Sequence, residues 1–161
     1  MIRNLRDNDA DAVLDIYQRG LDTGEASFET SPPDWPAWQL KYHPFCRLVW
    51  EQDGAVRGWA ALAQVSPREC YRGVAEVSIY VDTRHLGKGI GDRLMTALVE
   101  ESEKHGIWTL YSSIFPENQA TLRLHLRHDF REVGIRERIA RRDGRWRDTL
   151  LLERRSAKVG V

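Results

Sequence analysis

The sequence has 161 residues, enough for one domain with a sizeable core, and its 24 Lys and Arg residues balance its 24 Asp and Glu residues. This balance leaves no overall charge that would attract nucleic acid or an anionic membrane, so neither is expected as a partner. Arg3 and Asp7 interrupt the N-terminus, and no apolar run reaches the roughly 18 residues of a membrane span, so we expect a cytoplasmic protein without a signal peptide.

The N-terminal part of the sequence predicts a strand, two helices and a hairpin. Asn8 or Asp9 can cap the first helix, and Pro36 suits the first turn of the second. Asp53-Gly54 lies between two apolar runs and indicates a tight turn. The expected elements are a strand at 2–5, a helix from 8 or 9 to 19, a loop at 22–34, a helix at 35–42, and strands at 47–52 and 56–65.

The C-terminal part continues the alternation of strands and helices. Gly106 ends a helical pattern, and Asp143-Gly144 indicates a last hairpin. The expected elements are a strand at 74–82, a helix at 90–105, a strand at 107–115, a helix at 117–128, and strands at 130–140 and 146–153. We predict one domain over residues 1–155 and a C-terminal tail at 156–161.

The segment from Val77 to Asp92 is the most informative part of the sequence. It is expected to form a strand, a glycine-rich turn and the start of a helix. Gly87, Gly89 and Gly91 allow the backbone to turn tightly and to approach a ligand closely. A helix start favours an anion, because its first N–H groups are unpaired and the helix dipole is positive there. The segment therefore predicts a site for a phosphate-bearing ligand, and the alternative is a glycine-rich connection that binds nothing.

Three phosphate-binding motifs compete for this segment. A P-loop is excluded because Lys88 is followed by Gly89 and not by Ser or Thr, and the mid-sequence G-x-G-x-G spacing fits a Rossmann fingerprint poorly. The run Leu86-Gly87-Lys88-Gly89-Ile90-Gly91 resembles the pyrophosphate loop Q/R-x-x-G-x-G/A of the GNAT acyltransferases. Leu86 departs from that pattern, which removes a side-chain contact and leaves the backbone cradle.

The GNAT resemblance extends over nearly the whole sequence. It implies a mixed central sheet flanked by helices in the α/β (α+β) class, in the order β-α-α-β-β-β-α-β-α-β-β. It also implies acetyl-CoA as co-substrate, with no metal, its pyrophosphate on residues 87–92 and its pantetheine along the strand at 79–81. The residues expected to bind it are Ile79, Tyr80, Val81, Gly87, Lys88, Gly89, Ile90, Gly91, Asp92 and Asn118.

Glu76 is the first candidate catalytic residue. Strand alternation places it with Ser78 on the face opposite Val77 and Ile79. A carboxylate in a central strand is costly unless it is paired or used, so the alternative is an ordinary salt bridge. Acyl transfer to an alkylamine, with a pKa of about 10, needs a base to remove a proton. A carboxylate with a raised pKa can serve, directly or through water.

His125 is the second candidate. It lies seven residues after Asn118, two helical turns along, with Leu122 between them. The segment from Asn118 to Leu122 resembles the GNAT pattern N-x-x-A-x-x-L/F, in which the Asn contacts the pantetheine arm. By that resemblance His125 lies close to the thioester sulfur, where an imidazole can protonate a departing thiolate. A lone histidine on a helix is more often structural. A metal bound by His125 and His128 is not favoured, because no carboxylate or cysteine stands out as a third ligand.

Further motifs point to one branch of the family. Phe28-Glu29-Thr30, Arg68, Tyr71, Ala75-Glu76, Asn118, His125 and the run from Asp143 to Asp148 together resemble the phosphinothricin and methionine sulfoximine N-acetyltransferases. The resemblance implies acetylation of the α-amino group of a small amino-acid-like acceptor, and a homodimer. The expected acceptor-binding residues are Phe28, Arg68, Tyr71, Glu76 and Ser78.

Two residues bear on which acceptor is used. The arginine fork of Arg68 matches a pair of carboxylate or phosphinate oxygens, although a solvent-facing structural role is the alternative. Ser66 stands where members acting on phosphinothricin can carry a lysine, which weakens the case for phosphinothricin itself.

The expected mechanism is direct attack of the amine on the thioester. No acyl-enzyme is needed, so Cys46 and Cys70 are expected to be free and dispensable. The nine arginines from Arg131 to Arg155 alternate with acidic residues, which favours cross-strand pairs on a solvated face over a nucleic-acid patch. The competing functions are a protein, peptide or polyamine N-acetyltransferase, a non-catalytic acyl-CoA sensor and a nucleotide-binding module.

Overall fold

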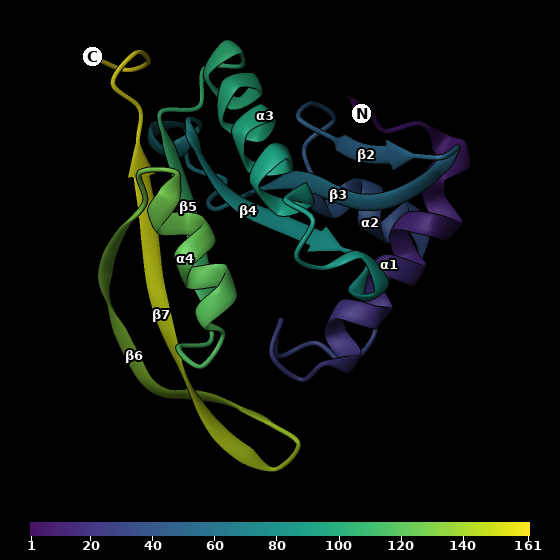
Figure 1. Ribbon diagram of the computed structural model, residues 1–161. Helices are drawn as coiled ribbons and strands as arrows, with labels where there is room; N and C mark the ends of the chain where they lie inside the picture. The colour runs from purple at the N-terminus through teal and green to yellow at the C-terminus, as the bar shows by residue number, and fades with distance from the viewer.

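A seven-stranded mixed sheet forms the centre of the computed structural model, which describes residues 1–161 (Figure 1). The strand order is β1-β2-β3-β4-β5-β7-β6, and only the β4–β5 pair is parallel. The strands are β1 Ile2–Asn4, β2 Leu48–Gln52, β3 Ala55–Gln64, β4 Val74–Val81, β5 Thr109–Ile114, β6 Arg131–Arg142 and β7 Arg145–Arg155.

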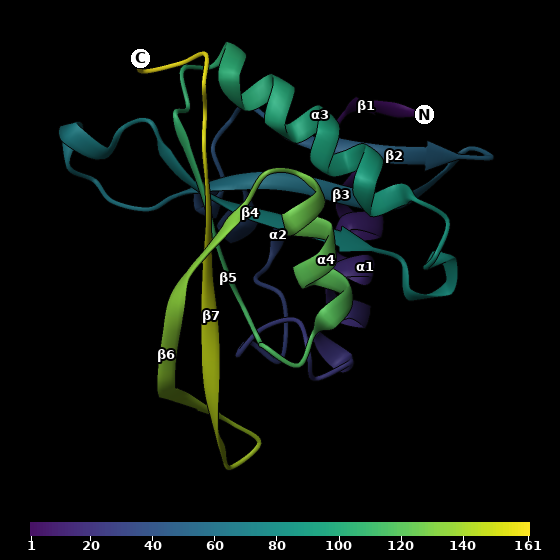
Figure 2. The ribbon, with the colours of Figure 1, turned by 60° about the vertical axis from the view of Figure 1, so that its left-hand side comes forward.

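Four helices cover the two faces of this sheet (Figures 1 and 2). They are α1 Ala10–Asp22, α2 Trp35–Lys41, α3 Ile90–Lys104 and α4 Gln119–Arg127. Helices α1 and α2 pack on one face, and α3 and α4 on the other. The predicted element order and the α/β (α+β) class, with a mixed central sheet flanked by helices, are confirmed. None of the helices is both long and apolar enough to cross a membrane.

The core consists of two apolar clusters separated by the sheet. Leu94 and Leu98 of α3 pack in one cluster with Ala75 and Val77 of β4. Trp38 of α2 packs in the other, with Val13, Tyr17 and Trp59, and Tyr80 of β4 contacts that cluster. The predicted alternation along β4 is therefore confirmed. Burying each large apolar residue contributes about 1.5–3 kcal/mol, so both faces anchor the strand that carries Glu76.

The predicted turns are present, and one predicted helix end is wrong. Asp53-Gly54 and Asp143-Gly144 both have positive φ at both residues, as a two-residue type I′ hairpin requires. Helix α1 is expected from the sequence to end at Arg19 but continues through Gly20 to Asp22. A Cβ on Gly20 would stand 2.5 Å from Cδ1 of Tyr80. This glycine therefore permits close helix–sheet packing and does not end the helix.

Strands β4 and β5 diverge along their length. They pair only from Val74 opposite Thr109 to Glu76 opposite Tyr111, whereas β3 follows the other edge of β4 as far as Val81. Beyond Glu76, the β4 edge that faces β5 therefore carries backbone N–H and C=O groups with no strand partner. The main cleft of the molecule opens at this separation.

The β6–β7 hairpin extends well beyond the rest of the sheet (Figures 1 and 2). The predicted cross-strand pairing of its arginines is right for Arg131, which contacts Glu153 opposite it. The prediction is wrong for Arg142, which is only 8% exposed, and for Arg147, whose side chain is 14% exposed. Both donate to carbonyls of the loop that follows α1 and do not point into solvent.

Candidate active site

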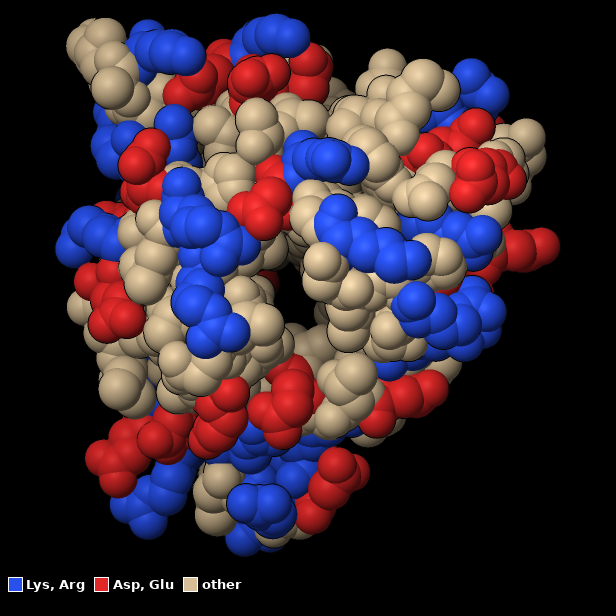
Figure 3. Space-filling model, in the orientation of Figure 1, with Lys and Arg blue, Asp and Glu red and all other residues tan.

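The cleft between β4 and α4 has a volume of about 760 Å³. Figure 3 shows its mouth as a dark opening near the centre of the face viewed, with basic and acidic residues around it. Most of the predicted site residues line it: Phe28, Glu76, Ser78, Ile79, Tyr80, Val81, Gly87, Gly89, Ile90, Gly91, Asp92, Asn118 and His125. Lys88, Arg68 and Tyr71 are not among the lining residues.

The glycine-rich turn lies at one end of the cleft, directly before α3. Gly87 and Gly89 both have φ of 74°, a left-handed conformation that favours glycine. Gly89 caps α3 with no side-chain hydrogen bond, and a Cβ on either glycine would meet nothing within 4 Å. The residues that carry the first N–H groups of this 15-residue helix line the cleft, and the space beside both glycines is open, which suits an anion site.

Asp92 places a carboxylate beside this anion site, but two basic residues pair with it. Arg127 donates to its two oxygens, both at 3.0 Å, and His128 Nε2 lies 3.2 Å from Oδ1. The hydrogen bond from Arg127 holds the pKa of Asp92 below its ordinary value. These contacts tie α3 to α4 and offset a charge that would otherwise repel a phosphate. Only the backbone N–H of Asp92 is suited to an anion.

Glu76 lies further along the cleft and is half-buried on the α1–α2 face of β4. Burial raises its pKa, the nearby Lys41 ammonium lowers it, and the Glu29 carboxylate raises it further. Glu76 has no ion-pair partner within 4.0 Å and no side-chain hydrogen bond, so the alternative of an ordinary salt bridge is not what the structure shows. A carboxylate without a partner, with a raised pKa and facing a cleft, is suited to accept a proton.

A polar network beside Glu76 comes from elements far apart in the sequence. The Tyr17 hydroxyl donates to Glu29 Oε2 at 2.7 Å, and Lys41 Nζ donates to the Tyr17 oxygen at 3.1 Å. Lys41 also lies 3.4 Å from Glu29 Oε1. Sequence reasoning misses Tyr17 and Lys41 as site residues, because neither belongs to a motif that marks it as functional. It includes Glu29 only as part of the Phe28-Glu29-Thr30 motif.

Ser78 is held at the same end of the cleft. Its Oγ accepts a hydrogen bond from the Tyr42 hydroxyl at 3.1 Å. The Ser78 hydroxyl can therefore still donate its own proton to a ligand in the cleft.

His125 is buried in the cleft wall, with 5% of its surface exposed. Its Nδ1 lies 2.7 Å from the Thr121 carbonyl oxygen, so Nδ1 carries the proton it donates there, while Nε2 has no partner. Burial lowers the pKa of His125, which favours the neutral ring. A neutral ring in this tautomer can accept a proton at Nε2. The proton-donor role toward a thiolate stays a prediction that burial opposes.

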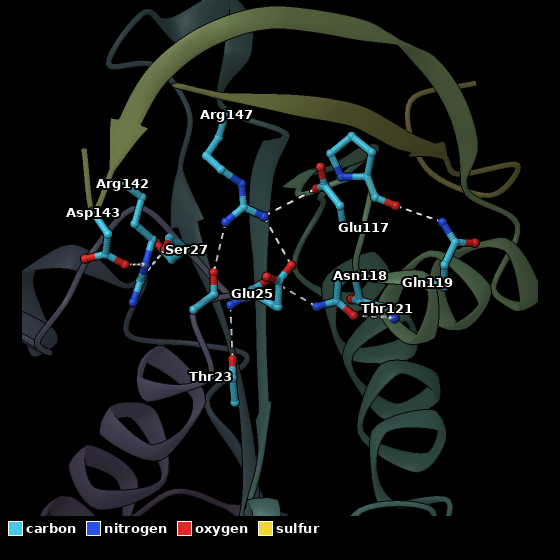
Figure 4. Close-up of polar contacts among 12 residues, drawn as sticks. Thr23, Glu25, Ser27, Glu117, Asn118, Gln119, Thr121, Arg142, Asp143 and Arg147 are labelled. Carbon is cyan, nitrogen blue, oxygen red and sulfur yellow. Dashed lines mark hydrogen bonds and ion pairs between the residues drawn. The ribbon is translucent and has the colours of Figure 1, made fainter. Parts of the chain in front are cut away.

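Asn118 caps α4 and does not lie within it. Its Oδ1 accepts from the Thr121 N–H at 3.2 Å, and its Nδ2 donates to the Glu25 carbonyl at 3.2 Å (Figure 4). An amide nitrogen has two N–H groups, so one remains for a ligand in the cleft. The second Nδ2–H group of Asn118 is available to a pantetheine arm, and the role of Asn118 in binding it stays a prediction.

The remaining predicted residues lie apart from the cleft. Arg68 and Tyr71 are exposed in the loop before β4, where the guanidinium lies 5.4 Å from the tyrosine ring centroid. Their acceptor-binding role stays a prediction. Cys46 is buried and Cys70 exposed, both are free as expected, and neither lines the cleft. No thiol is therefore placed to form an acyl-enzyme in the cleft.

Comparisons with known proteins agree with this arrangement. The acetyltransferase (GNAT) family profile matches residues 10–130. A phosphinothricin N-acetyltransferase from Alcaligenes faecalis is 33% identical over 95% of the present sequence and 81% of its own. An L-methionine sulfoximine/L-methionine sulfone acetyltransferase from Pseudomonas aeruginosa is 28% identical over 94% of the present sequence and 92% of its own.

A solved structure shows the same fold with a ligand. A GNAT superfamily phosphinothricin acetyltransferase from Sinorhizobium meliloti, in complex with acetyl-CoA, superposes with a TM-score of 0.88 at 26% identity, over 99% of the present sequence and 90% of its own. The protein belongs to the GNAT family of N-acetyltransferases, and its resemblance to the phosphinothricin and methionine sulfoximine branch is confirmed.

Proposed function

We propose that the protein transfers acetyl from acetyl-CoA to the α-amino group of a small amino-acid-like acceptor of the methionine sulfoximine or phosphinothricin type. The observation that carries the proposal is that one cleft joins an open anion site to an unpaired carboxylate. The first suits the pyrophosphate of the co-substrate. The second suits removal of a proton from an amine.

The residues present fit acetyl-CoA along the whole cleft. The N–H groups at the start of α3 would hold the pyrophosphate, in the open space above Gly87 and Gly89. The unpaired edge of β4 at Ile79–Val81 offers backbone groups for the amides of pantetheine. One of these N–H groups would also stabilise the oxyanion that develops on the thioester carbonyl.

Glu76 would remove a proton from the acceptor ammonium, directly or through water. Its raised pKa makes the carboxylate a stronger base for this step. The amine nitrogen then attacks the thioester carbonyl carbon, the C–N bond forms and the C–S bond breaks. The nitrogen then carries one proton more than the amide, which it gives up as the leaving thiolate takes up a proton, and no covalent enzyme intermediate is formed.

The acceptor end of the cleft has the charges that a zwitterion needs. Glu29 and Glu76 line the cleft where they can face the ammonium group of an acceptor, and the Lys41 ammonium, in the same cleft, can face its carboxylate. Lys41 on α2 would therefore supply the positive charge that is missing at position 66, where this sequence has Ser66 instead of a lysine. Arg68 remains a second candidate for the same carboxylate, from outside the cleft.

We also propose a homodimer, as the branch resemblance implies. The long hairpin exposes Ile135 at 63% and Trp146 at 54%, which supports a contact between subunits there. Sedimentation of wild type and of the double variant Ile135→Glu, Trp146→Glu tests it. The variant should sediment as a monomer, and an unchanged dimer would place the contact elsewhere.

Acetylation of a protein N-terminus is the nearest alternative function. It would need an open groove for the peptide, whereas residues 23–30 lie across the acceptor end and contact the β6–β7 hairpin. This closure supports a small acceptor over a peptide or a polyamine.

A thiol-release assay with acetyl-CoA tests the function. The panel holds methionine sulfoximine, methionine sulfone, phosphinothricin, common amino acids, a polyamine and a basic peptide. We expect release with the amino-acid analogues in wild type and its loss in Glu76→Gln. Release with the peptide or polyamine alone would contradict the acceptor class. Acetyl-CoA binding without release for any amine would favour a sensor, and ATP binding without acetyl-CoA binding would favour a nucleotide module.

A further inference from the structure

The wall at the acceptor end of the cleft is a segment without helix or strand. Residues 23–30, named here the acceptor loop, connect α1 to the approach of α2 and bring Phe28 and Glu29 to the cleft. A segment with no ladder of its own hydrogen bonds is held in place only by contacts from elsewhere. Two arginines of the β6–β7 hairpin, Arg142 and Arg147, supply four of these contacts.

Arg142, at the end of β6, binds the backbone of the acceptor loop. Its Nη2 donates to the Leu21 carbonyl at 2.8 Å, and its Nη1 donates to the carbonyls of Glu29, at 2.7 Å, and of Ser27. Figure 4 shows Arg142 directed at Ser27, with Asp143 beside it. One buried guanidinium thus satisfies a carbonyl in the last turn of α1 and two carbonyls in the second half of the loop. Hydrogen bonds from a charged donor are about twice as strong as neutral ones.

Arg147, on β7, joins the acceptor loop to the opposite rim of the cleft. Its Nη1 donates to the Gly24 carbonyl at 3.2 Å. Its Nη2 lies 3.1 Å from Glu25 Oε2 and 3.3 Å from Glu117 Oε2 (Figure 4). Glu25 is in the loop, whereas Glu117 lies just before α4. The Asn118 amide strengthens the same bridge, since it donates to the Glu25 carbonyl.

Arg147 also connects to the acceptor end through aromatic rings. Its guanidinium carbon lies 3.9 Å from the ring centroid of Phe115. The Phe115 ring meets Phe28 edge to face, with centroids 5.0 Å apart, and Phe28 lines the cleft. A displacement of the Arg147 side chain would therefore displace Phe28 as well as the loop backbone.

An irregularity in the hairpin brings both arginines to the loop. Arg136 pairs with Thr149 and Ala140 pairs with Arg147, so an advance of four residues along β6 lies opposite an advance of two residues along β7. Such a bulge bends a strand and increases its twist. The bend is held by the Asp148 carboxylate, which accepts from the Arg138 N–H at 2.7 Å, where Arg138 has a φ of 45°.

We propose that Arg142 and Arg147 are positioning residues that hold the acceptor loop across the cleft and thereby set the affinity for the amine acceptor. Arg142 fixes the loop backbone. Arg147 sets how closely the two rims approach, through carboxylates on both of them. This role rests on the proposed function for its kinetic consequence, but the ordering of the loop does not depend on it.

The kinetic test compares Arg147→Ala with Arg145→Ala, a control in the same hairpin where the exposed arginine makes no side-chain hydrogen bond or ion pair. We expect the KM for the acceptor to rise about tenfold in Arg147→Ala, with kcat and the KM for acetyl-CoA within about twofold of wild type. Arg147→Lys keeps the charge but not the fork, and should give an intermediate acceptor KM. Equal rises in both KM values, or no change in either, would overturn the proposal.

Hydrogen exchange of the same proteins without substrate tests the ordering of the acceptor loop separately from its effect on the acceptor KM. We expect the amides of residues 23–30 to exchange faster in Arg147→Ala than in wild type, and to be unchanged in Arg145→Ala. Unchanged exchange in Arg147→Ala would overturn the positioning role even if the kinetics changed. If wild type shows no turnover with any amine, the proposed function fails, and the exchange result still decides whether Arg147 orders the loop.

Discussion

The two ends of the cleft are built in different ways. The end proposed to bind acetyl-CoA, named here the cofactor end, consists of backbone from one continuous segment, which comprises the edge of β4, the glycine turn and the first turn of α3. The acceptor end consists of functional groups from separate elements, with Tyr17 on α1, Glu29 in the acceptor loop, Lys41 at the end of α2 and Glu76 on β4.

This difference indicates how each end can change. A backbone site keeps its geometry as long as the glycines allow the turn, whatever the neighbouring residues are. A site made of side-chain groups depends on the packing of distant elements, so a single substitution can alter which acceptor fits. We therefore expect substitutions at one end to leave the other end nearly unaffected.

The largest expected effect comes from Glu76→Gln, which removes the proposed base and keeps the shape of the side chain. We expect kcat/KM for the acceptor to fall by about a hundredfold to ten-thousandfold, the range for loss of a positioned general base. In wild type the activity should be lost as the pH falls through the raised pKa of Glu76, since the protonated carboxyl cannot accept a proton. A pH–rate profile of both proteins checks this.

Stability gives the control for Glu76→Gln. A carboxyl whose pKa is raised by folding destabilises the folded state as the pH rises above its ordinary value of 4.5. The variant should therefore be at least as stable as wild type at neutral pH in urea unfolding. A large loss of stability would mean that the carboxylate is structural, and the loss of activity would no longer identify a base.

Gly89→Ala tests the cofactor end. A left-handed φ of 74° costs a residue with a Cβ on the order of 1 kcal/mol, and the added methyl enters the open cradle. We expect the KM for acetyl-CoA to rise about tenfold and the KM for the acceptor to change little.

Gly106→Ala is the matched control for Gly89→Ala, because Gly106 has φ of 76° and equally open surroundings at the far end of α3. It should cost a similar free energy of unfolding and leave both KM values unchanged. A rise in the KM for acetyl-CoA in this control would show that strain, and not the cradle, produces the effect.

A smaller effect is expected at His125, where burial lowers the pKa below the ordinary value of 6.5. The unfolded state then binds the proton more readily than the folded state, so His125 lowers stability as the pH falls below that value. The free energy of unfolding should therefore fall less on acidification in His125→Gln than in wild type. An equal fall in both proteins would show that the ring is not held neutral.

The smallest effect is expected at the cysteines. Cys70 is exposed, whereas burial raises the pKa of the Cys46 thiol to about 12. Alkylation under native conditions should modify Cys70 alone and leave the activity unchanged. Inactivation that acetyl-CoA prevents would contradict the direct-transfer mechanism, because it would place a thiol in the cleft.

The sequence is sufficient for the parts of the molecule that follow local rules. Strand alternation places Glu76 opposite Val77, the Asp-Gly pairs locate both hairpins, and the three glycines indicate the anion site. Each of these features depends on neighbours within a few sequence positions.

The parts that depend on tertiary contacts cannot be predicted in this way. Lys41 and Tyr17 meet only because α1 and α2 pack together on the sheet, and Gly20 is explained only by the approach of Tyr80. The sequence predicts a solvated face for Arg142 and Arg147, since acidic residues suited to cross-strand pairs lie nearby. The two-residue irregularity in β6 that directs both arginines to the acceptor loop has no sequence signal that we can identify.

The most direct test of the separation between the two ends is calorimetric titration with acetyl-CoA in the absence of any acceptor. We predict that the Kd of Glu76→Gln stays within about twofold of wild type and that the Kd of Gly89→Ala rises about tenfold. If Glu76→Gln weakened acetyl-CoA binding as much as Gly89→Ala did, the two ends would be one coupled site, which would contradict their separation.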